Sequence, residues 1–419
     1  MKYSIVIWIA AMGLTLAMLA QVAQAYSQEE LDMISACFSS PSTCAAPTSS
    51  EPTGPQLPLT LIPGAALSFR GDDTLSPRMS PDGSQIAFNF LSGGAVFRIA
   101  RAGWMDGAPF GTTVGPSTLT GLGGIDDSAV VAGTRTTGNP WVSSLPGDLS
   151  LISIFDYDSG TANDLGSNDQ RIVGSVFDAD SGPFGDNRLA IWDFNVVTMD
   201  WGLTTRNGLG FGFQGGLLAM TPDGLFAVGL SDSAAATGTF DAQAISFDLT
   251  TNTTTALPFL AGTPHNDALA NALSDDASII IGNVDGFLGT PVAAQWSGGG
   301  ITELPRLPGH TESAGLAVAG DGLTAGGSSG TDAVVWDTTT FGVRKLSGYV
   351  LGAGLTIPAG CLLTSVTDMD GDGLLLTGNA LCSGKQRVYE LEMPYPVPEP
   401  SLPWGLMAGV GMLALRRNR

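Results

Sequence analysis

Only two histidines occur in this chain, and both occupy the same setting. His265 is followed two residues later by Asp267, and His310 is followed two residues later by Glu312. Each histidine also lies eleven residues before an aspartate in a Gly- or Ala-containing turn. Imidazole and carboxylate groups are common ligands of divalent transition metals. These four residues are therefore candidates for a metal site, although the pattern also fits polar loop residues that bond to their own backbone.

A second candidate site is the acidic run Asp368-Met-Asp370-Gly-Asp372-Gly. Alternating carboxylates followed by a glycine are typical of calcium-binding loops, which point such side chains toward one ion. The bidentate glutamate that closes these loops is missing, because Asn379 stands at its position. The run therefore predicts either a calcium site, calcium being the one candidate cofactor, or a hairpin turn that carries extra acid.

No motif in the sequence indicates a catalytic centre. Gly326-Gly-Ser-Ser-Gly330 matches the spacing of a nucleophile elbow, but that motif needs a strand before it and a helix after it. Here short apolar runs lie on both sides, which predicts a turn between two strands. We assign no catalytic residues, and the sequence favours a protein that is not an enzyme.

The chain that positions these residues is built from a repeated unit. An apolar run, an Asp-containing turn and a second apolar run recur at intervals of about 42–55 residues, and a third run often ends in Trp-Asp. Examples are Met79-SPDGSQIAF-Phe88, Met220-TPDGLFAVG-Gly229 and Leu316-AVAGDGLTAG-Gly327. Such runs are too short and too glycine-rich for helices, and they predict antiparallel strands.

Seven such copies predict an all-β fold, a seven-bladed β-propeller, because four-stranded blades have this period and cannot bury both faces alone. A β-sandwich or a β-solenoid with irregular repeats is the alternative. The last repeat has three predicted strands. We expect residues 57–62, the apolar segment LPLTLI, to supply the fourth strand and so to close the ring from the N-terminal end.

The Ser80-Pro-Asp-Gly83 and Thr221-Pro-Asp-Gly224 turns resemble the WD40-like blades of TolB-type propellers. Later copies, with an Asp turn, a Val/Ile-Gly end and a closing tryptophan, resemble the HAF repeats of exported bacterial proteins. The resemblance covers residues 75–393. It implies a propeller, and because propellers host many functions it implies little about the ligand.

The N-terminus predicts a secretion signal. Lys2 is followed by an apolar run from Ile5 to Leu19 and then by Ala23-Gln-Ala25, which has the small residues of a signal-peptidase site. A permanent N-terminal anchor is the alternative. Residues 26–56 predict a short helix and a Ser/Pro-rich linker, so the expected organisation is 1–25 signal peptide, 26–56 linker, 57–393 propeller and 394–419 tail.

The C-terminal tail carries three elements in order. Val397-Pro398-Glu399-Pro400 precedes an apolar run at 402–415, and Arg416, Arg417 and Arg419 follow it. This order resembles the PEP-CTERM sorting signal, which implies an exosortase-type processing enzyme as partner and an association with exopolysaccharide. The apolar run is shorter than the about 20 residues of a spanning helix. We therefore expect transient anchoring of a hydrophobic helix in the inner membrane followed by removal, with an uncleaved anchor as the alternative.

Four cysteines in an exported chain predict disulfides. Cys37 lies near Cys44, and Cys361 and Cys382 both lie in the last repeat. Three pairings are possible, and we expect the two local ones.

Composition limits the partners. The net charge of −22, with only three lysines, disfavours binding to nucleic acid and to anionic lipid. We expect an exported protein at the cell surface or outside the cell that acts as a structural or interaction protein for envelope proteins or extracellular polysaccharide. A propeller-type lyase or glycosidase, and a TolB-like protein-docking propeller, are the alternatives.

Overall fold

The computed structural model describes residues 66–393, with gaps at 71–73, 91–95, 101–111, 114–118, 136, 144–149, 167–169, 181–185, 210–214, 233–241, 263–266 and 286–289. All of them belong to one compact unit, Thr60–Arg419. The predicted signal peptide, linker, sorting tail and N-terminal cysteine pair lie outside the described residues, and so does His265.

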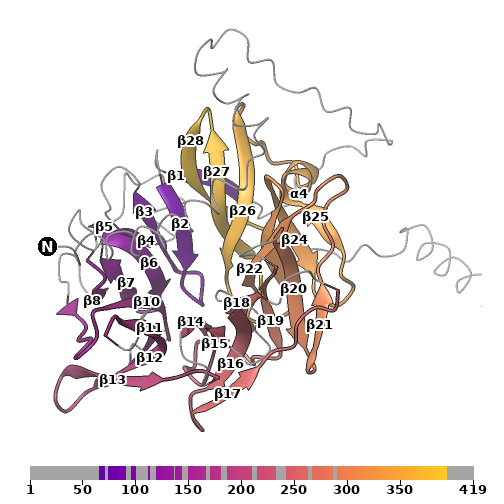
Figure 1. Ribbon diagram of the computed structural model, residues 1–419. Helices are drawn as coiled ribbons and strands as arrows, with labels where there is room; N and C mark the ends of the chain where they lie inside the picture. Colours follow the sequence, from indigo (N-terminus) through magenta and orange to yellow (C-terminus); the bar gives the residue numbers. More distant parts are fainter. Residues whose placement is uncertain are drawn as a thin grey trace, which may run out of the picture. The chain divides into compact units, whose positions relative to one another are not determined.

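The described strands form seven four-stranded antiparallel sheets, which we call blades and number along the chain (Figure 1). Blade 1 contains β2 (Thr74–Met79), β3 (Gln85–Phe90), β4 (Val96–Ala100) and β5 (Thr112–Thr113). Blade 2 contains β6 (Leu119–Ile125), β7 (Val131–Arg135), β8 (Pro140–Ser143) and β9 (Ser150–Leu151). Blade 3 contains β10 (Ser159–Leu165), β11 (Arg171–Asp178), β12 (Asp186–Asn195) and β13 (Asp200–Arg206).

The other four blades follow the same plan. Blade 4 contains β14 (Gly215–Met220), β15 (Phe226–Asp232), β16 (Ala242–Asp248) and β17 (Thr253–Ala256). Blade 5 contains β18 (Ala268–Leu273), β19 (Ile279–Val284), β20 (Val292–Ser297) and β21 (Gly300–Glu303). Blade 6 contains β22 (Ser313–Val318), β23 (Thr324–Ser329), β24 (Asp332–Asp337) and β25 (Val343–Lys345), followed by α4 (Leu346–Gly352). Blade 7 combines β1 (Ala66–Arg70) with β26 (Cys361–Met369), β27 (Leu375–Cys382) and β28 (Lys385–Glu392).

The blades form a closed ring. The first strand of each blade contacts the first strand of the next, from β2 through β6, β10, β14, β18 and β22 to β26, and β2 in turn contacts β26, β27 and β28. The prediction of an all-β propeller is confirmed. The strand before each Asp-containing turn is the innermost of its blade. Six blades consist of four consecutive strands, and the seventh is built from both ends of the ring.

The N-terminal closing strand exists, but it is not the predicted one. Strand β1, residues 66–70, pairs with β28 along five residues and completes blade 7, visible as an indigo strand beside yellow ones in Figure 1. The expected segment 57–62 lies outside the described residues. Leu67 and Phe69 alternate along β1 and pack against the largest buried cluster of blade 7. Leu57, Leu59 and Leu61 of the expected segment alternate in the same way, so alternation alone does not select between the two segments. Pro58 differs in having no N–H to donate to a ladder.

A glycine stands near the middle of the second strand because a backbone carbonyl leaves no room there for a side chain. In blade 3 the first strand bulges between Ala162 and Asp164, and a Cβ on Gly174 would collide with the carbonyl oxygen of Thr161. The same register shift and the same collision recur in blades 4, 5 and 6. In these four blades the bulge therefore requires the glycine that ends the apolar run of the repeat.

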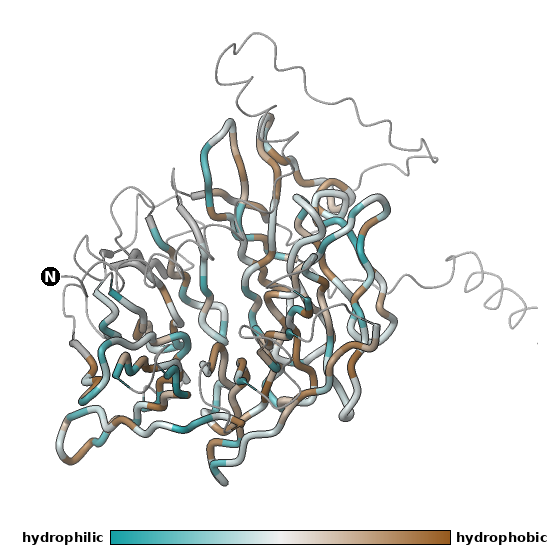
Figure 2. Tube along the Cα trace, in the orientation of Figure 1, coloured by the Kyte–Doolittle hydropathy of each residue, from teal (hydrophilic) through white to brown (hydrophobic). Residues whose placement is uncertain are grey.

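The repeated tryptophans anchor the blades. Trp192, Trp296 and Trp336 are buried, and each indole Nε1 donates to a carbonyl oxygen 2.7–3.0 Å away in the connection that precedes its own blade. Trp141 and Trp201, which lie outside this repeated pattern, are also buried. In Figure 2 the hydrophobic residues concentrate in the strands.

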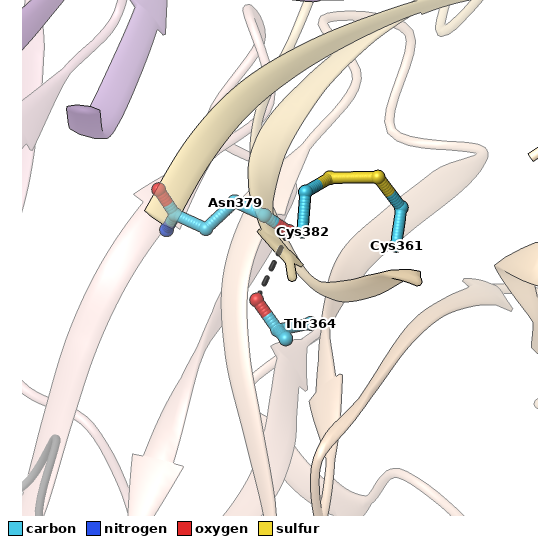
Figure 3. The surroundings of a disulfide bond; sticks show 4 residues. All are labelled: Cys361, Thr364, Asn379 and Cys382. Atoms are coloured by element: carbon cyan, nitrogen blue, oxygen red, sulfur yellow. Dashed lines mark hydrogen bonds between the residues drawn. A yellow bond between two sulfur atoms is a disulfide. The ribbon is translucent and has the colours of Figure 1, made fainter. Parts of the chain in front are cut away.

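The disulfide predicted in the last repeat is present. Cys361 and Cys382 are opposite each other in the β26–β27 ladder and are bonded (Figure 3). Near them, the hydroxyl of Thr364 donates to the carbonyl oxygen of Asn379 at 3.0 Å. The disulfide fixes the open end of the β26–β27 hairpin, opposite its turn. Among the described helices, none is long and apolar enough to cross a membrane.

Candidate functional site

A narrow channel lies where the innermost strands of all seven blades meet. It encloses about 110 Å³ and is lined by residues of every first strand, among them Arg78, Asn163, Asp164, Asn271 and Asp368. A bulge redirects side chains locally, and the extra residue at the bulge lines the channel in blades 3 to 6. It is polar in blades 3 and 5, as Asn163 and Asn271, and a leucine in blades 4 and 6. The channel is therefore the place where the fold gathers polar groups from distant parts of the sequence.

Two of the four aspartates that line the channel join neighbouring blades. One carboxylate oxygen of Asp164 accepts the N–H of Leu165 at 2.9 Å, and the other accepts that of Met220, in the next blade, at 2.8 Å. Asp368 does the same with Met369 at 2.9 Å and, across the closure of the ring, with Met79 at 3.0 Å. Each carboxylate thus satisfies backbone donors that a bulged strand leaves without ladder partners.

Two asparagines make the equivalent bonds elsewhere in the channel. The side-chain amide of Asn163 donates to the carbonyl oxygen of Leu217 at 2.7 Å. The side-chain amide of Asn271 donates to the carbonyl oxygen of Gly315, also at 2.7 Å. Arg78 donates to the carbonyl oxygen of Thr367 at 3.3 Å, between blades 1 and 7. The polar channel residues therefore act as connections between blades.

Electrostatics couple the charged channel residues. Burial raises the pKa of Asp164 to about 7, and the backbone donors and the positive charge of Arg78 limit that rise. Burial also raises the pKa of Asp368, and Arg78 again opposes the shift. A carboxyl that titrates near neutrality could transfer a proton. Both oxygens of these two groups, however, are already engaged by backbone N–H groups.

The Asp-containing turns form a second polar feature at one end of the channel. The turns of successive blades bond directly: the N–H of Asp275 donates to Gly320, that of Asp321 to Gly371, and that of Gly371 to Pro81, over 2.8–3.0 Å. The N–H of Asp82 donates to the carboxylate of Asp127 at 2.9 Å. Burial raises the pKa of Asp275, as do the nearby charges of Asp223, Asp276 and Asp321.

The three aspartates of the predicted calcium run are used separately. Asp368 lies in β26 and faces the channel, whereas Asp370 and Asp372 lie in the turn that follows and accept the N–H groups of Leu375 and Leu374. Within the described ranges, no three His, Cys, Asp or Glu side chains are grouped so that they could hold a metal ion. The calcium hypothesis stays a prediction without a ligand cluster to support it.

Of the predicted histidine site, the described members His310, Glu312 and Asp267 are not among the channel-lining residues. The His310 ring is 3.1 Å from the Ser329 hydroxyl through Nδ1 and 3.8 Å from the Asp332 carboxylate through Nε2, both in the β23–β24 hairpin of its own blade. The carbonyl oxygen of Glu312 accepts the N–H of Gly330 in that hairpin. Asp267 is buried where β18 begins. Because His265 lies outside the described residues, the paired-histidine metal site stays a prediction.

Of the channel residues described above, sequence reasoning singled out only Asp368, and it did so as a calcium ligand. Asn163, Asp164 and Asn271 belong to no motif, and their partners are backbone groups 44 to 56 residues away in the chain. The available signal was a polar residue in an otherwise apolar first strand, repeated in several blades. Such a residue must find a partner when buried.

Comparison with known proteins places the chain by fold only. No protein-family model and no curated protein matches its sequence. A solved structure of oligogalacturonate lyase from Vibrio parahaemolyticus superposes with a TM-score of 0.51 at 10% identity, over 80% of this chain and 98% of the lyase.

Two further structures show the same kind of likeness at lower scores. Hydrazine synthase from Kuenenia stuttgartiensis has a TM-score of 0.49 at 14% identity, over 75% of this chain and 95% of its own. TolB from Acinetobacter baumannii has a TM-score of 0.39 at 12% identity, over 79% of this chain and 80% of the TolB chain. This chain is a β-propeller. At such identities the likenesses carry no activity, substrate or partner across.

Asp370, in the turn of blade 7, leads us to expect an unusual dependence of stability on pH. In blades 1, 4 and 5, a hydroxyl from Ser80, Thr221 or Ser274 donates to the aspartate two residues later at 2.6–2.7 Å. Asp370 takes this position in blade 7, beside Asp372, and it can donate only when protonated. Burial, together with Asp372, raises the pKa of Asp370 to about 7.

Replacing Asp370 with serine should therefore stabilise the protein at high pH. The unfolded carboxyl ionises near pH 4, so the folded chain holds a proton that the unfolded chain releases between about pH 4 and pH 7, and stability falls as pH rises through that window. Denaturant unfolding should show Asp370→Ser more stable than the parent by on the order of 1 kcal/mol at pH 8, with the difference shrinking toward pH 4.

Asp276→Asn is the matched control, because hydrogen bonds from Ser278 and Ser274 hold the pKa of Asp276 below its ordinary value. Its effect has the opposite sign: the variant should be less stable than the parent at pH 8, and the loss should disappear as pH falls. A pH-independent effect of Asp370→Ser would contradict the proposed protonation.

Proposed function

We propose that this chain is an exported, non-catalytic interaction propeller. Its predicted signal peptide directs it across the membrane, and its PEP-CTERM-like tail holds it at the inner membrane until an exosortase-type enzyme removes that tail. The released propeller then associates with extracellular polysaccharide or with envelope proteins. Transport in this form agrees with the disulfide in blade 7, because disulfides persist outside the reducing cytosol.

The observation that carries the non-catalytic part is the use of the channel carboxylates. Asp164 and Asp368 are two of the four aspartates that line the channel, and each spends both oxygens on backbone N–H groups of its own and the next blade. A general acid or base needs a lone pair or proton that can reach a substrate. These side chains support a rigid ring that presents its loops for binding.

Two measurements test the proposal. Intact-mass spectrometry of protein recovered outside the producing cells should show an N-terminus near Tyr26 and a C-terminus upstream of the apolar run at 402–415. Glu399→Ala, in the Val397–Pro400 motif, should leave the tail attached and keep the protein in the membrane fraction. An intact chain in the cytosol would contradict the proposed route.

The second measurement separates binding from catalysis. The secreted protein should sediment with exopolysaccharide purified from the same cells, without releasing reducing ends or unsaturated products. Release of sugar that Asp164→Asn or His310→Ala abolishes would instead support the lyase or glycosidase alternative. A protein that neither sediments with the polysaccharide nor releases sugar, but is retained on isolated envelopes, would point to protein docking.

A further inference from the structure

An aromatic side chain stands exposed beside a pocket of blade 3. Phe155 is 63% exposed, the largest such value among the aromatic residues that the structure describes. It borders a pocket of about 290 Å³, near the lower end of the range for ligand sites, which is about 300–1,000 Å³. The pocket is lined by two aromatic, two acidic and two further residues: Phe155, Asp156, Tyr157, Asp178, Leu203 and Thr205.

The Phe155 backbone is strained. Its φ is +48°, a left-handed conformation that is unfavourable for a bulky side chain. It lies in a tight turn in which the N–H of Tyr157 donates to the carbonyl oxygen of Ile154 at 3.1 Å. Glycine or asparagine would suit this turn better. Strained residues cluster at functional sites, and unlike Met199, which is also strained and exposed, Phe155 borders a pocket.

The surrounding structure holds this turn in place. The carbonyl oxygen of Ser153 accepts the indole N–H of Trp192 at 3.0 Å, and the carboxylate of Asp158 accepts the N–H of Ala179 at 2.7 Å. The Tyr157 hydroxyl is 3.0 Å from the Thr205 hydroxyl on β13. The turn is thus fixed to three strands of blade 3 or their ends, so the pocket is preformed, which lowers the entropy cost of binding.

The chemistry of the lining selects the ligand class. Asp156 and Asp178, in a chain of net charge −22, disfavour an anion. The Arg188 guanidinium, 6.0 Å from the centre of the Tyr157 ring, disfavours a second cation there. A neutral ring with one apolar face and several hydroxyls satisfies both features, because its C–H face can stack on Phe155 while its hydroxyls donate to the carboxylates.

We infer that this pocket binds a neutral sugar unit, with Phe155 as the stacking platform and Asp156 and Asp178 as hydroxyl acceptors. The assignment rests on the proposed function, in that it names the place and the sugar class through which the propeller holds polysaccharide. It assigns no reaction to the pocket.

The test uses the mature secreted protein and calorimetric titration with four hexasaccharides, built from glucose, mannose, N-acetylglucosamine or galacturonate. At least one neutral hexasaccharide should bind, and the anionic galacturonate should not. Phe155→Asn should weaken that binding by about tenfold or more. The same variant should raise the melting temperature by about 1–2 °C, because asparagine tolerates the left-handed backbone.

Met199 supplies a matched control. It is also exposed, also lies in blade 3, and also has a positive φ, of 56°, but it does not line the pocket. Met199→Asn should raise the melting temperature similarly and leave sugar binding unchanged. This pairing separates loss of a binding group from relief of backbone strain.

Three results would overturn the inference: no neutral hexasaccharide bound up to roughly 10 mM, equal binding by Phe155→Asn, or preference for galacturonate. These failures are distinct from failure of the proposed function. Retention on native polysaccharide that Phe155→Asn does not reduce would leave the function standing and remove this site. Sugar binding by a protein that is never exported would leave this site standing and contradict the proposed function.

Discussion

Deleting β1 is expected to lower the free energy of unfolding by on the order of 5 kcal/mol. The strand supplies five paired residues to β28 and buries parts of Leu67 and Phe69 against blade 7. The Phe69 ring lies 6.4 Å from that of Tyr389, centre to centre. Loss of β1 also exposes the edge of β28, which can then pair with another chain.

Two truncated chains test this prediction. One begins at Ala65 and retains β1, and the other begins at Gly71, which removes β1 and leaves β2 intact. Chemical denaturation should give a clearly lower midpoint for the second chain, and light scattering should show it self-associating. Phe69→Ala should fall between them, at a loss of about 2 kcal/mol. Equal midpoints for the two truncations would show that ring closure does not depend on β1.

The ring closure also shows how far sequence reasoning reaches. The need for an N-terminal strand followed from counting strands in the last repeat, and that count was right. The choice of 57–62 was wrong, because an apolar segment without a hairpin partner is not unique to those residues. Leu57, Leu59 and Leu61 alternate just as Leu67 and Phe69 do, so the period-2 pattern could not decide which segment pairs with β28.

Local features were predicted well because their causes are local. The Asp-containing turns, the glycine that faces the bulge and the tryptophan anchors depend on contacts within one blade or with the segment leading into it. Each appears in the sequence at a nearly constant spacing. The Cys361–Cys382 bond belongs to the same class, since its residues are partners in one hairpin.

The channel could not be predicted because its contacts are between blades. The bond from the N–H of Met79 to Asp368 spans 289 residues, and nothing in either segment marks the other. The calcium hypothesis failed to anticipate this use of Asp368, because spacing alone does not tell whether a carboxylate faces an ion or a backbone donor. The Phe155 turn was missed for a related reason: its interest lies in a backbone angle that sequence does not display.

Removing the positive charge at Arg78 is expected to destabilise the ring in a pH-dependent way. Arg78 lowers the pKa values of both Asp164 and Asp368, which burial raises. Without it, the two carboxylates keep their cost of burial and their mutual repulsion but lose their nearest compensation. Arg78→Met should cost on the order of 2 kcal/mol at pH 8, as expected when one partner of a buried charged group is removed.

The cost should be smaller at pH 5 because Asp164, whose pKa is about 7 even with Arg78 present, is then largely protonated, and the pKa of Asp368 is raised in the same direction. The sign follows from the linkage between protonation and folding. A group whose pKa is raised in the folded state loses its favourable contribution to stability as pH rises from its unfolded-state pKa through its folded-state pKa. Arg78→Met raises the folded-state pKa values further and so extends this pH range upward. Denaturant unfolding at pH 5 and pH 8 measures the difference directly.

Arg78→Lys separates charge from shape at this position. The lysine keeps the charge and loses the guanidinium geometry that reaches the Thr367 carbonyl oxygen, so its cost should be modest and nearly equal at the two pH values. Asp368→Asn combined with Arg78→Met should recover part of the loss at pH 8, because it removes one of the two uncompensated charges. If Arg78→Met costs the same at pH 5 and pH 8, the channel charges are not coupled, and hydrogen bonds alone connect the blades at the axis.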